Sequence, residues 1–205
     1  MDVCADASSL EASAAEAVQL LGGSIDCLCY AAGVGQRTLA TETSADGHRQ
    51  LMATNFEGAV ALSRAVLPPM LSGGSGQLVV VSSVQGFFGQ PGRSSYAASK
   101  AAMISYFDAL RAEVAPRGVG VTVVAPGYIA TDHSASAVGG DGSSDENSSK
   151  GMPPEELASQ IADAVEGGKA QLVASQLDGR VAIVLRAVWP EALHWLMERK
   201  ARKLL

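Results

Sequence analysis

The sequence has little cysteine, fewer basic than acidic residues and no long uncharged apolar run, and each shortage excludes a class of protein. Three cysteines in 205 residues are too few, and odd in number, for the disulfide framework of a small secreted domain. Lysine and arginine number 15 against 21 aspartates and glutamates, and the net charge of −6 argues against a broad nucleic-acid surface. No apolar run is long enough for a membrane-spanning helix. The hydrophobic content of 47% instead indicates one folded intracellular domain, either cytoplasmic or associated with a membrane.

The cysteines and histidines do not suggest a metal site. Cys27 and Cys29 lie in an apolar segment, and we expect them, with Cys4, to be reduced core residues. The histidines are His48, His133 and His194, which are far apart and lack the spacing of metal ligands. We therefore expect no metal. We expect the histidines to be solvated or core residues. For His133, which lies in a segment predicted to flank the substrate, the alternative is contact with substrate.

Short apolar segments alternate with helical segments along the chain. The predicted strands are 25–31, 77–82, 119–125 and 171–174, and the predicted helices are 8–21, 43–69, 95–114 and 153–166. We expect the long second helix to end at Pro68 and Pro69, because proline removes a helical hydrogen bond. The alternation predicts an α/β fold with a parallel sheet. We predict a single domain over 1–205, with a flexible substrate-side loop at 134–152 and a helical tail at 178–205.

The segment from 83 to 100 carries the chemistry. Tyr96 precedes Lys100 by four residues, and Ser83 lies thirteen residues before Tyr96. Residues i and i+4 of a helix share a face, so the phenol and the ammonium can converge on one point. A free phenol has a pKa of about 10, and a nearby positive charge lowers it. With a hydroxyl beside it to hold a substrate oxygen, such a phenol can move a proton on or off a carbonyl or an alcohol.

This arrangement resembles the short-chain dehydrogenase/reductase family, whose catalytic Y-x-x-x-K motif and upstream serine match Tyr96, Lys100 and Ser83. Other stretches follow in the family's order: Asp2 and Val3 near the adenine ring, Y-A-A-G at 30–33 in place of N-N-A-G, Asn55 in a helix, and P-G-Y-I-A-T at 126–131. The likeness covers the whole chain. The last of these motifs and the basic C-terminal end are most similar to the 7B-like branch of the family.

The resemblance implies a Rossmann-type sheet with flanking helices, and an oxidoreductase that transfers hydride between a nicotinamide cofactor and a carbonyl or alcohol, with lipid-like substrates plausible. Tyr96 would be the acid–base, Lys100 would lower its pKa and hold the ribose, and Ser83 would steady the substrate oxygen. Asn55 would hold a water of the proton relay. The resemblance favours NADP over NAD, although the residues that choose between them follow a strand that this chain lacks.

Further residues are assigned by their place in the family's motifs. The implied cofactor contacts are Asp2, Val3, Ala32, Gly33, Tyr96, Lys100, Pro126, Gly127, Ile129 and Thr131. The implied substrate contacts are Ser83, Gln85 and Tyr96, with Phe87, Phe88, Gln90 and Tyr128 as pocket walls. Ala31 departs from the family's second asparagine, so its side chain cannot hydrogen-bond to neighbouring strands.

The family also begins with a strand, a glycine-rich turn and a helix, and no such turn precedes Asp2. Gly22 and Gly23 follow a predicted helix and precede a strand, which is the reverse order. We therefore expect the first three strands to be missing and the strand at 25–31 to be a sheet edge. Such an edge predicts weak cofactor binding and self-association, and an anchor could lie upstream. The alternatives to an enzyme are a non-catalytic remnant or interaction protein, and a fragment of a longer product.

The tail at 178–205 allows two interpretations. It is apolar, contains Trp189 and Trp195, and ends in Arg199, Lys200, Arg202 and Lys203. Pro190 should divide it into two helices. These helices could pack on the domain or on another subunit, or they could lie on a membrane surface, where the basic cluster adds electrostatic attraction.

Overall fold

The protein is described by a computed structural model that covers residues 2–3, 7–143 and 146–204. Its described residues form one sheet of four parallel strands, in the order β1-β2-β3-β4. The strands are β1 (Cys27–Tyr30), β2 (Gly76–Val81), β3 (Val119–Pro126) and β4 (Gln171–Ala174). This confirms the predicted Rossmann-type sheet, and within the described residues β1 is an edge strand.

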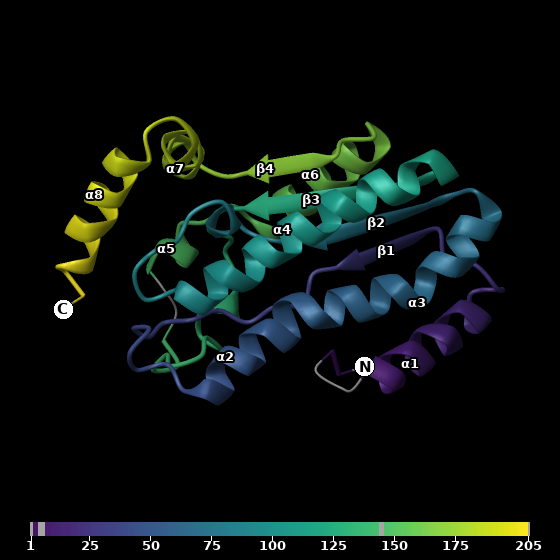
Figure 1. Ribbon diagram of the computed structural model, residues 1–205, viewed down its shortest axis with the longest axis horizontal. Coiled ribbons are helices and arrows are strands. Elements are labelled where there is room, and N and C mark those ends of the chain that lie inside the picture. Colours follow the sequence, from purple (N-terminus) through teal and green to yellow (C-terminus); the bar gives the residue numbers. More distant parts are fainter. Residues whose placement is uncertain (1, 4–6, 144–145, 205) are drawn as a thin grey trace.

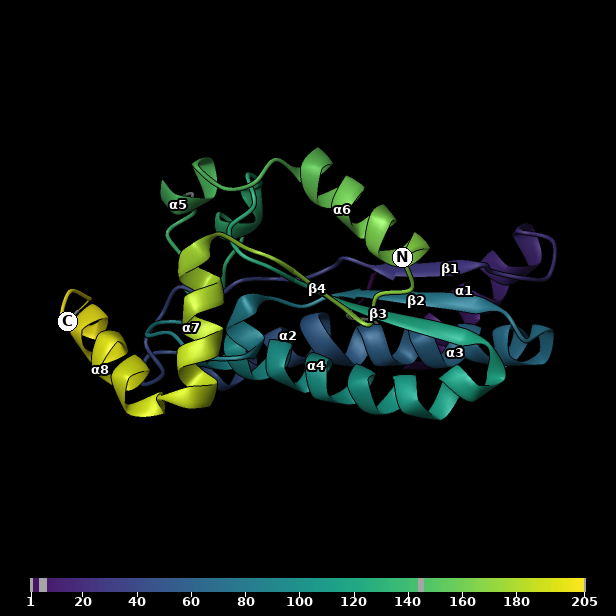
Figure 2. The ribbon, with the colours of Figure 1, turned by 90° about the horizontal axis from the view of Figure 1, so that it is seen from above.

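Helices cover both faces of this sheet (Figures 1 and 2). They are α1 (Ala7–Leu20), α2 (Ala45–Met52), α3 (Gly58–Gly73), α4 (Ser94–Val114), α5 (Glu146–Ser149), α6 (Pro154–Glu166), α7 (Leu177–Val188) and α8 (Pro190–Ala201). The helices α3 and α4 lie on one face with α1 outside α3, and α6 lies on the other face over β3 and β4. The predicted division of the tail at Pro190 is confirmed. Among the described helices, none has the length and apolar character needed to cross a bilayer.

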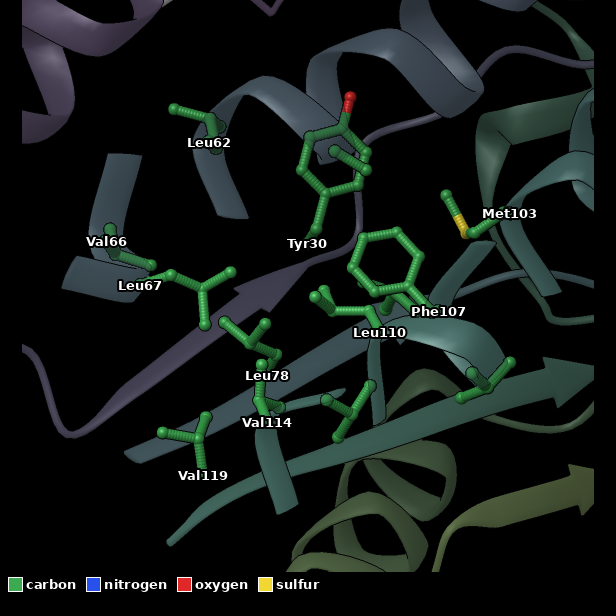
Figure 3. Close-up of a cluster of buried hydrophobic side chains, with 14 of the residues drawn as sticks. Tyr30, Leu62, Val66, Leu67, Leu78, Met103, Phe107, Leu110, Val114 and Val119 are labelled. Carbon is green, nitrogen blue, oxygen red and sulfur yellow. The ribbon is translucent and has the colours of Figure 1, made fainter. Parts of the chain in front are cut away.

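The main core lies between the sheet and the helices α3 and α4 (Figure 3). Phe107 and Met103 of α4 are fully buried against valines of β2 and β3. The central strand β3 is buried over almost its whole length, as expected for a valine-rich strand in a parallel sheet. Burying each large aliphatic or aromatic side chain stabilises the fold by about 1.5–3 kcal/mol. This packing holds α4 rigidly against the strand ends.

The long second helix differs from its prediction. It begins at the N-cap Ser44 as expected, but it contains one π-helical turn from Ala53 to Glu57 and continues through Pro68 and Pro69 to Gly73. Because proline has no backbone N–H, the carbonyls one turn earlier lose their helical hydrogen bonds. These carbonyls lie near the exposed Arg64, where water can donate to them instead. The helix ends instead where Gly74 adopts a left-handed conformation.

The prediction that the cysteines are core residues is wrong for Cys27 and Cys29, which are exposed. In β1 the side chains of Leu28 and Tyr30 point to the core, so the two cysteines share the opposite face. The helix on that side, α6, contacts β3 and β4, and within the described residues no helix covers β1 there. Cys4 lies outside the described residues.

Gly118, at the start of β3, should not tolerate a side chain. Its φ is +81°, and a Cβ atom there would lie 2.0 Å from the carbonyl oxygen of Gly74. We expect Gly118→Ala to lower the free energy of unfolding by about 2 kcal/mol or more. Gly73→Ala is the matched control, because nothing lies within 4 Å of its Cβ position and alanine favours a helix by about 1 kcal/mol. Urea unfolding of both variants measures the difference, and equal stabilities would contradict the argument.

Candidate active site

The carboxyl ends of the strands and the loops that follow them border a cavity of about 800 Å³. Ligands of open α/β sheets bind at this edge. Most of the site residues that the sequence suggested line the cavity: Gly33 after β1, Ser83 and Gln85 after β2, Tyr96 and Lys100 on α4, Pro126 at the end of β3, and Gly127, Ile129 and Thr131 after it. Of the suggested pocket walls, Phe88, Gln90 and Tyr128 also line it.

Besides Asn55, which is described below, four of the suggested residues do not line the cavity. Asp2 is exposed, and Val3 packs on the core cluster beside Gly58. Ala32 also packs on this cluster, and Phe87 packs on Val84 and Leu193. None of the four lines the cavity. The structure therefore assembles the part of the suggested site that surrounds Tyr96, and it leaves the residues suggested for the adenine ring outside.

Tyr96 lies in the first turn of α4 and is almost fully buried. Its pKa is raised above the ordinary value, first because burial disfavours the phenolate. A hydrogen bond with the Ser83 side chain and the positive charge of Arg93 act in the opposite direction and lower the pKa. The expectation that Lys100 lowers the pKa of Tyr96 is not met. Tyr96 is therefore a protonated phenol at neutral pH.

Lys100 is also buried, and burial lowers the pKa of its ammonium to about 8. Because this value lies below the raised pKa of Tyr96, Lys100 is neutral at the pH at which Tyr96 would lose its proton. Its Nζ donates a hydrogen bond of 2.8 Å to the carbonyl oxygen of Val81 at the end of β2. It lies 5.8 Å from the centre of the Tyr96 ring. Both side chains line the same cavity.

Asn55 sits in the π-helical turn and is fully buried. Its Nδ2 donates to the carbonyl of Val34 at 3.0 Å and to the Ser99 hydroxyl at 2.9 Å, and its Oδ1 accepts from the Val34 amide at 2.8 Å. The side chain therefore ties the loop after β1 to α4. Single π-helical turns inside α-helices are frequent at functional sites. This one turns Asn55 toward the back of the cavity without making it a lining residue.

Sequence reasoning missed Gln36, which caps α4. This residue is fully buried, and its Oε1 accepts hydrogen bonds from the amides of Ser95 at 2.8 Å and Tyr96 at 3.0 Å. Its Nε2 donates to the Thr43 hydroxyl at 2.9 Å. Amides in the first turn of a helix have no partner within the helix, and the N-cap residue Arg93 makes no side-chain cap. Only the polarity of Gln36 after an apolar strand could have drawn attention to it.

His133 is closer to the site than its sequence position indicated. Its ring centre is 6.1 Å from that of Tyr96, and its ring lies against Gly33 and Gly35. Partial burial, followed by the charges of Lys100 and Arg93, lowers its pKa. A neutral imidazole is therefore the expected form at neutral pH. A residue assigned only an alternative role by the sequence thus lines the cavity directly.

Removing the Gln36 cap should loosen the start of α4. We expect Gln36→Leu to lower the free energy of unfolding by about 2–4 kcal/mol, since two buried amides lose their acceptor. Amide hydrogen exchange in a peptide spanning 94–100 should accelerate. Gln77→Leu is the control, because Gln77 hydrogen-bonds Thr122 on β3 and does not contact α4 through a hydrogen bond. Unchanged exchange at 94–100 in Gln36→Leu would show that the cap does not hold Tyr96.

The burial of Lys100 should appear in the pH dependence of stability. The pKa of this group is about 8 in the folded protein, against 10.5 for a free lysine. Between these values the unfolded chain binds more protons, so stability must rise with pH. We expect a rise of about 1–2 kcal/mol between about pH 8 and about pH 9.5 from this group alone. The rise should persist in the control Lys150→Met, whose lysine is exposed, and be absent in Lys100→Met. Equal slopes in the two variants would refute the burial argument.

Comparison with known proteins agrees with the geometry. A family model described as short chain dehydrogenase matches residues 1–140. Dehydrogenase/reductase SDR family member 7B of Danio rerio is 42% identical over 200 residues, which are 96% of this chain and 65% of that protein. The corresponding protein of Xenopus laevis is 41% identical over 97% of this chain and 63% of its own length. The chain thus spans less than two thirds of these curated relatives.

Solved structures show the same architecture. A short-chain dehydrogenase from Streptomyces avermitilis superposes with a TM-score of 0.79, at 28% identity over 98% of this chain and 78% of that chain. A short chain dehydrogenase from Burkholderia cenocepacia, solved in complex with NADP, gives a TM-score of 0.79 at 26% identity, over 96% of this chain and 76% of that chain. With the family model matching well over half of its residues, the chain belongs to the short-chain dehydrogenase/reductase family and is similar to its 7B members.

Proposed function

We propose that the protein is a short-chain oxidoreductase that reduces the carbonyl group of a largely apolar substrate with a nicotinamide cofactor. The observation that carries this proposal is the placement of Tyr96, hydrogen-bonded to Ser83 and close to Lys100, inside the cavity at the strand ends. A buried phenol with a hydroxyl partner can give a proton to a carbonyl oxygen. Because burial raises the pKa of Tyr96, the protonated form predominates at neutral pH, and this is the form that donates a proton in carbonyl reduction.

The residues around Tyr96 fit the nicotinamide half of such a cofactor. At Gly33 a Cβ atom would lie 3.2 Å from the Asn55 Oδ1 atom and 3.4 Å from the Lys100 Nζ atom, so the missing side chain leaves the backbone open to a ligand. Lys100 would donate to ribose hydroxyls, and Pro126, Gly127, Ile129 and Thr131 would border the ring. The bound cofactor would supply the hydride. The Burkholderia relative was solved with NADP, which supports NADP as the first cofactor to test.

Within the cavity, each side chain would have a separate task. Tyr96 would donate the proton to the carbonyl oxygen, and Ser83 would hold that oxygen by a hydrogen bond. Asn55 would keep the loop carrying Gly33 against α4, through its bonds to Val34 and Ser99. His133, lying against Gly33 and Tyr96, would exclude water from one side of the reacting atoms. Tyr96 and Asn55 lie within helices, and Ser83 caps a helical turn, so regular backbone structure positions these three side chains.

The rest of the cavity favours a substrate with a large apolar part, which agrees with a lipid-like molecule. Its far wall is formed by apolar side chains of three helices: Leu157 and Ile161 of α6, Val181 and Leu185 of α7, and Leu193 and Leu196 of α8. Gln85 adds one polar contact. It is buried, and its Oε1 has no hydrogen-bond partner. A buried acceptor without a partner is costly, so a hydroxyl or amide hydrogen of the substrate would be bound there.

The test is turnover of an apolar ketone with NADPH. We expect Tyr96→Phe to reduce kcat by about 10²–10⁴-fold, because the ring remains and only the proton donor is lost. Tyr106→Phe is the control, since Tyr106 lies on the same helix and packs on Phe56 outside the cavity. Circular dichroism should be unchanged for both variants. Tyr96→Phe with the turnover of the parent protein would refute the role of Tyr96. A folded parent protein that neither binds NADPH nor turns over would instead support a non-catalytic descendant of the family.

A further inference from the structure

The outer face of α7 carries a continuous apolar stripe. Leu177, Val181, Val184 and Val188 are spaced by four, three and four residues, so they share one side of the helix. Their exposed fractions are 76%, 46%, 57% and 73%. Trp189, between α7 and α8, is 61% exposed, and Trp195 of α8 is 54% exposed. A contiguous exposed apolar face of this kind marks an interaction surface rather than a scatter of surface residues.

The stripe does not reflect a loosely attached tail, because the inner side of the helix pair is packed. Leu193 of α8 is buried against Val84 and Phe88, and Ile183 and Leu185 of α7 pack on the same cluster. Arg180 donates hydrogen bonds to the carbonyls of Ser175 and Val173 at the end of β4. The pair α7–α8 is therefore held against the sheet end. Its orientation leaves Leu177, Val184 and Val188 facing outward, while Val181, at the inner edge of the stripe, also lines the cavity.

The charge of this region is opposite to that of the rest of the protein. Residues 177–205 carry six basic side chains and three acidic ones, a net charge of +3, so the remainder of the chain carries −9 in the total of −6. Four of the basic residues follow the aromatic ones at or beyond the end of α8: Arg199, Lys200, Arg202 and Lys203. On α7, Arg180 is bonded to the end of β4, and Arg186 lies on the side of the helix opposite the stripe. The guanidinium of Arg199 lies 4.8 Å from the centre of the Trp195 ring.

We propose that α7 and α8 dock the protein on an anionic lipid surface, with the stripe and the two tryptophans in the interfacial layer. Valine and leucine side chains next to tryptophan and a cluster of arginine and lysine suit the boundary between headgroups and acyl chains. A second copy of the chain fits less well, because a two-fold contact would bring two surfaces of charge +3 together. The remaining −9 is repelled by the same lipid surface, which orients the molecule with α7 and α8 toward it.

This docking would place the cavity at the membrane. Val181, Ala182 and Leu185 of α7 and Leu193, Leu196 and Met197 of α8 line it, and both helices stand at one end of the molecule (Figures 1 and 2). An apolar substrate could then pass between the bilayer and the cavity without crossing water. This consequence rests on the proposed function, whereas the docking itself does not depend on catalysis.

The protein carries its own probe for the test. The chain has two tryptophans, Trp189 and Trp195, and both belong to the proposed docking surface. We expect their fluorescence to shift to shorter wavelength on adding vesicles of mixed phosphatidylcholine and phosphatidylserine. Vesicles of phosphatidylcholine alone should give a much smaller shift, and high salt should reverse most of it. Brominated lipids should quench the emission, and the protein should float with the anionic vesicles.

Three sets of variants distinguish docking through this surface from non-specific binding to lipid. Val184→Glu with Val188→Glu should weaken partitioning by at least about tenfold. Arg202→Gln with Lys203→Gln should weaken it by about 25-fold, roughly fivefold for each charge removed. Leu20→Glu with Leu21→Glu, at the end of α1, is the matched control. These leucines are 80% and 65% exposed, and α1 lies far from α7 and α8 in Figure 1. This control should bind like the parent protein.

Other outcomes would overturn the proposal. They are no partitioning to anionic vesicles, equal partitioning to uncharged ones, or an equal loss in the α1 variant. A dimer in size-exclusion chromatography that Val184→Glu with Val188→Glu dissociates, without lipid binding, would identify a second copy as the occupant. Because the measurements need no turnover, a failure of the proposed enzymatic function leaves them interpretable.

Discussion

The site depends on how the first two turns of α4 are held. Gln36 accepts hydrogen bonds from the amides of Ser95 and Tyr96, and the Ser82 hydroxyl donates to the carbonyl of Lys100 one turn later. Between them, Ser99 donates to the Tyr96 carbonyl and accepts from Asn55. The loop after β1, the π-helical turn and the end of β2 therefore all meet one stretch of helix. Buried hydrogen bonds of this kind restrict a side chain more than packing alone, since each broken bond leaves a polar group without a partner.

The same arrangement lowers the stability of the folded protein. Burial lowers the pKa of Lys100 to about 8 and raises the pKa of Tyr96, because it disfavours the charged form of each. The Oε1 atom of Gln85 is buried without a partner. Polar groups in these states reduce stability unless a ligand completes their interactions. They lie together at the strand ends, while the core between the sheet and α3 and α4 is apolar, so the stability lost at the cavity is offset elsewhere.

The two ends of the strands have different roles. At the amino ends, the turns at Gly74 and Gly118 meet closely and align β2 with β3. At the carboxyl ends, longer segments spread apart and enclose the cavity, and α7 and α8 close one side of it. The positive charge of this helix pair, beside a negatively charged domain, divides the molecule electrostatically as well. The candidate site and its apolar wall thus lie at the carboxyl ends of the strands, at the end of the molecule where Figure 2 shows α7 and α8.

The sequence by itself determined the order of strands and helices, because apolar periodicity and helix signals are local. The strand at Gln171–Ala174 and the break at Pro190 agree with the structure, and the spacing of Tyr96 and Lys100 was enough to place both on one side of a helix. Only the tertiary structure decided which distant segments meet. Gln36 reaches an amide sixty residues away, His133 lies over Gly33, and Cys29 faces the cavity instead of the core. The direction of the Tyr96 pKa shift was also decided there, because burial outweighs the opposing effects of Ser83 and Arg93. Burial is a property of the assembled fold rather than of spacing along the chain.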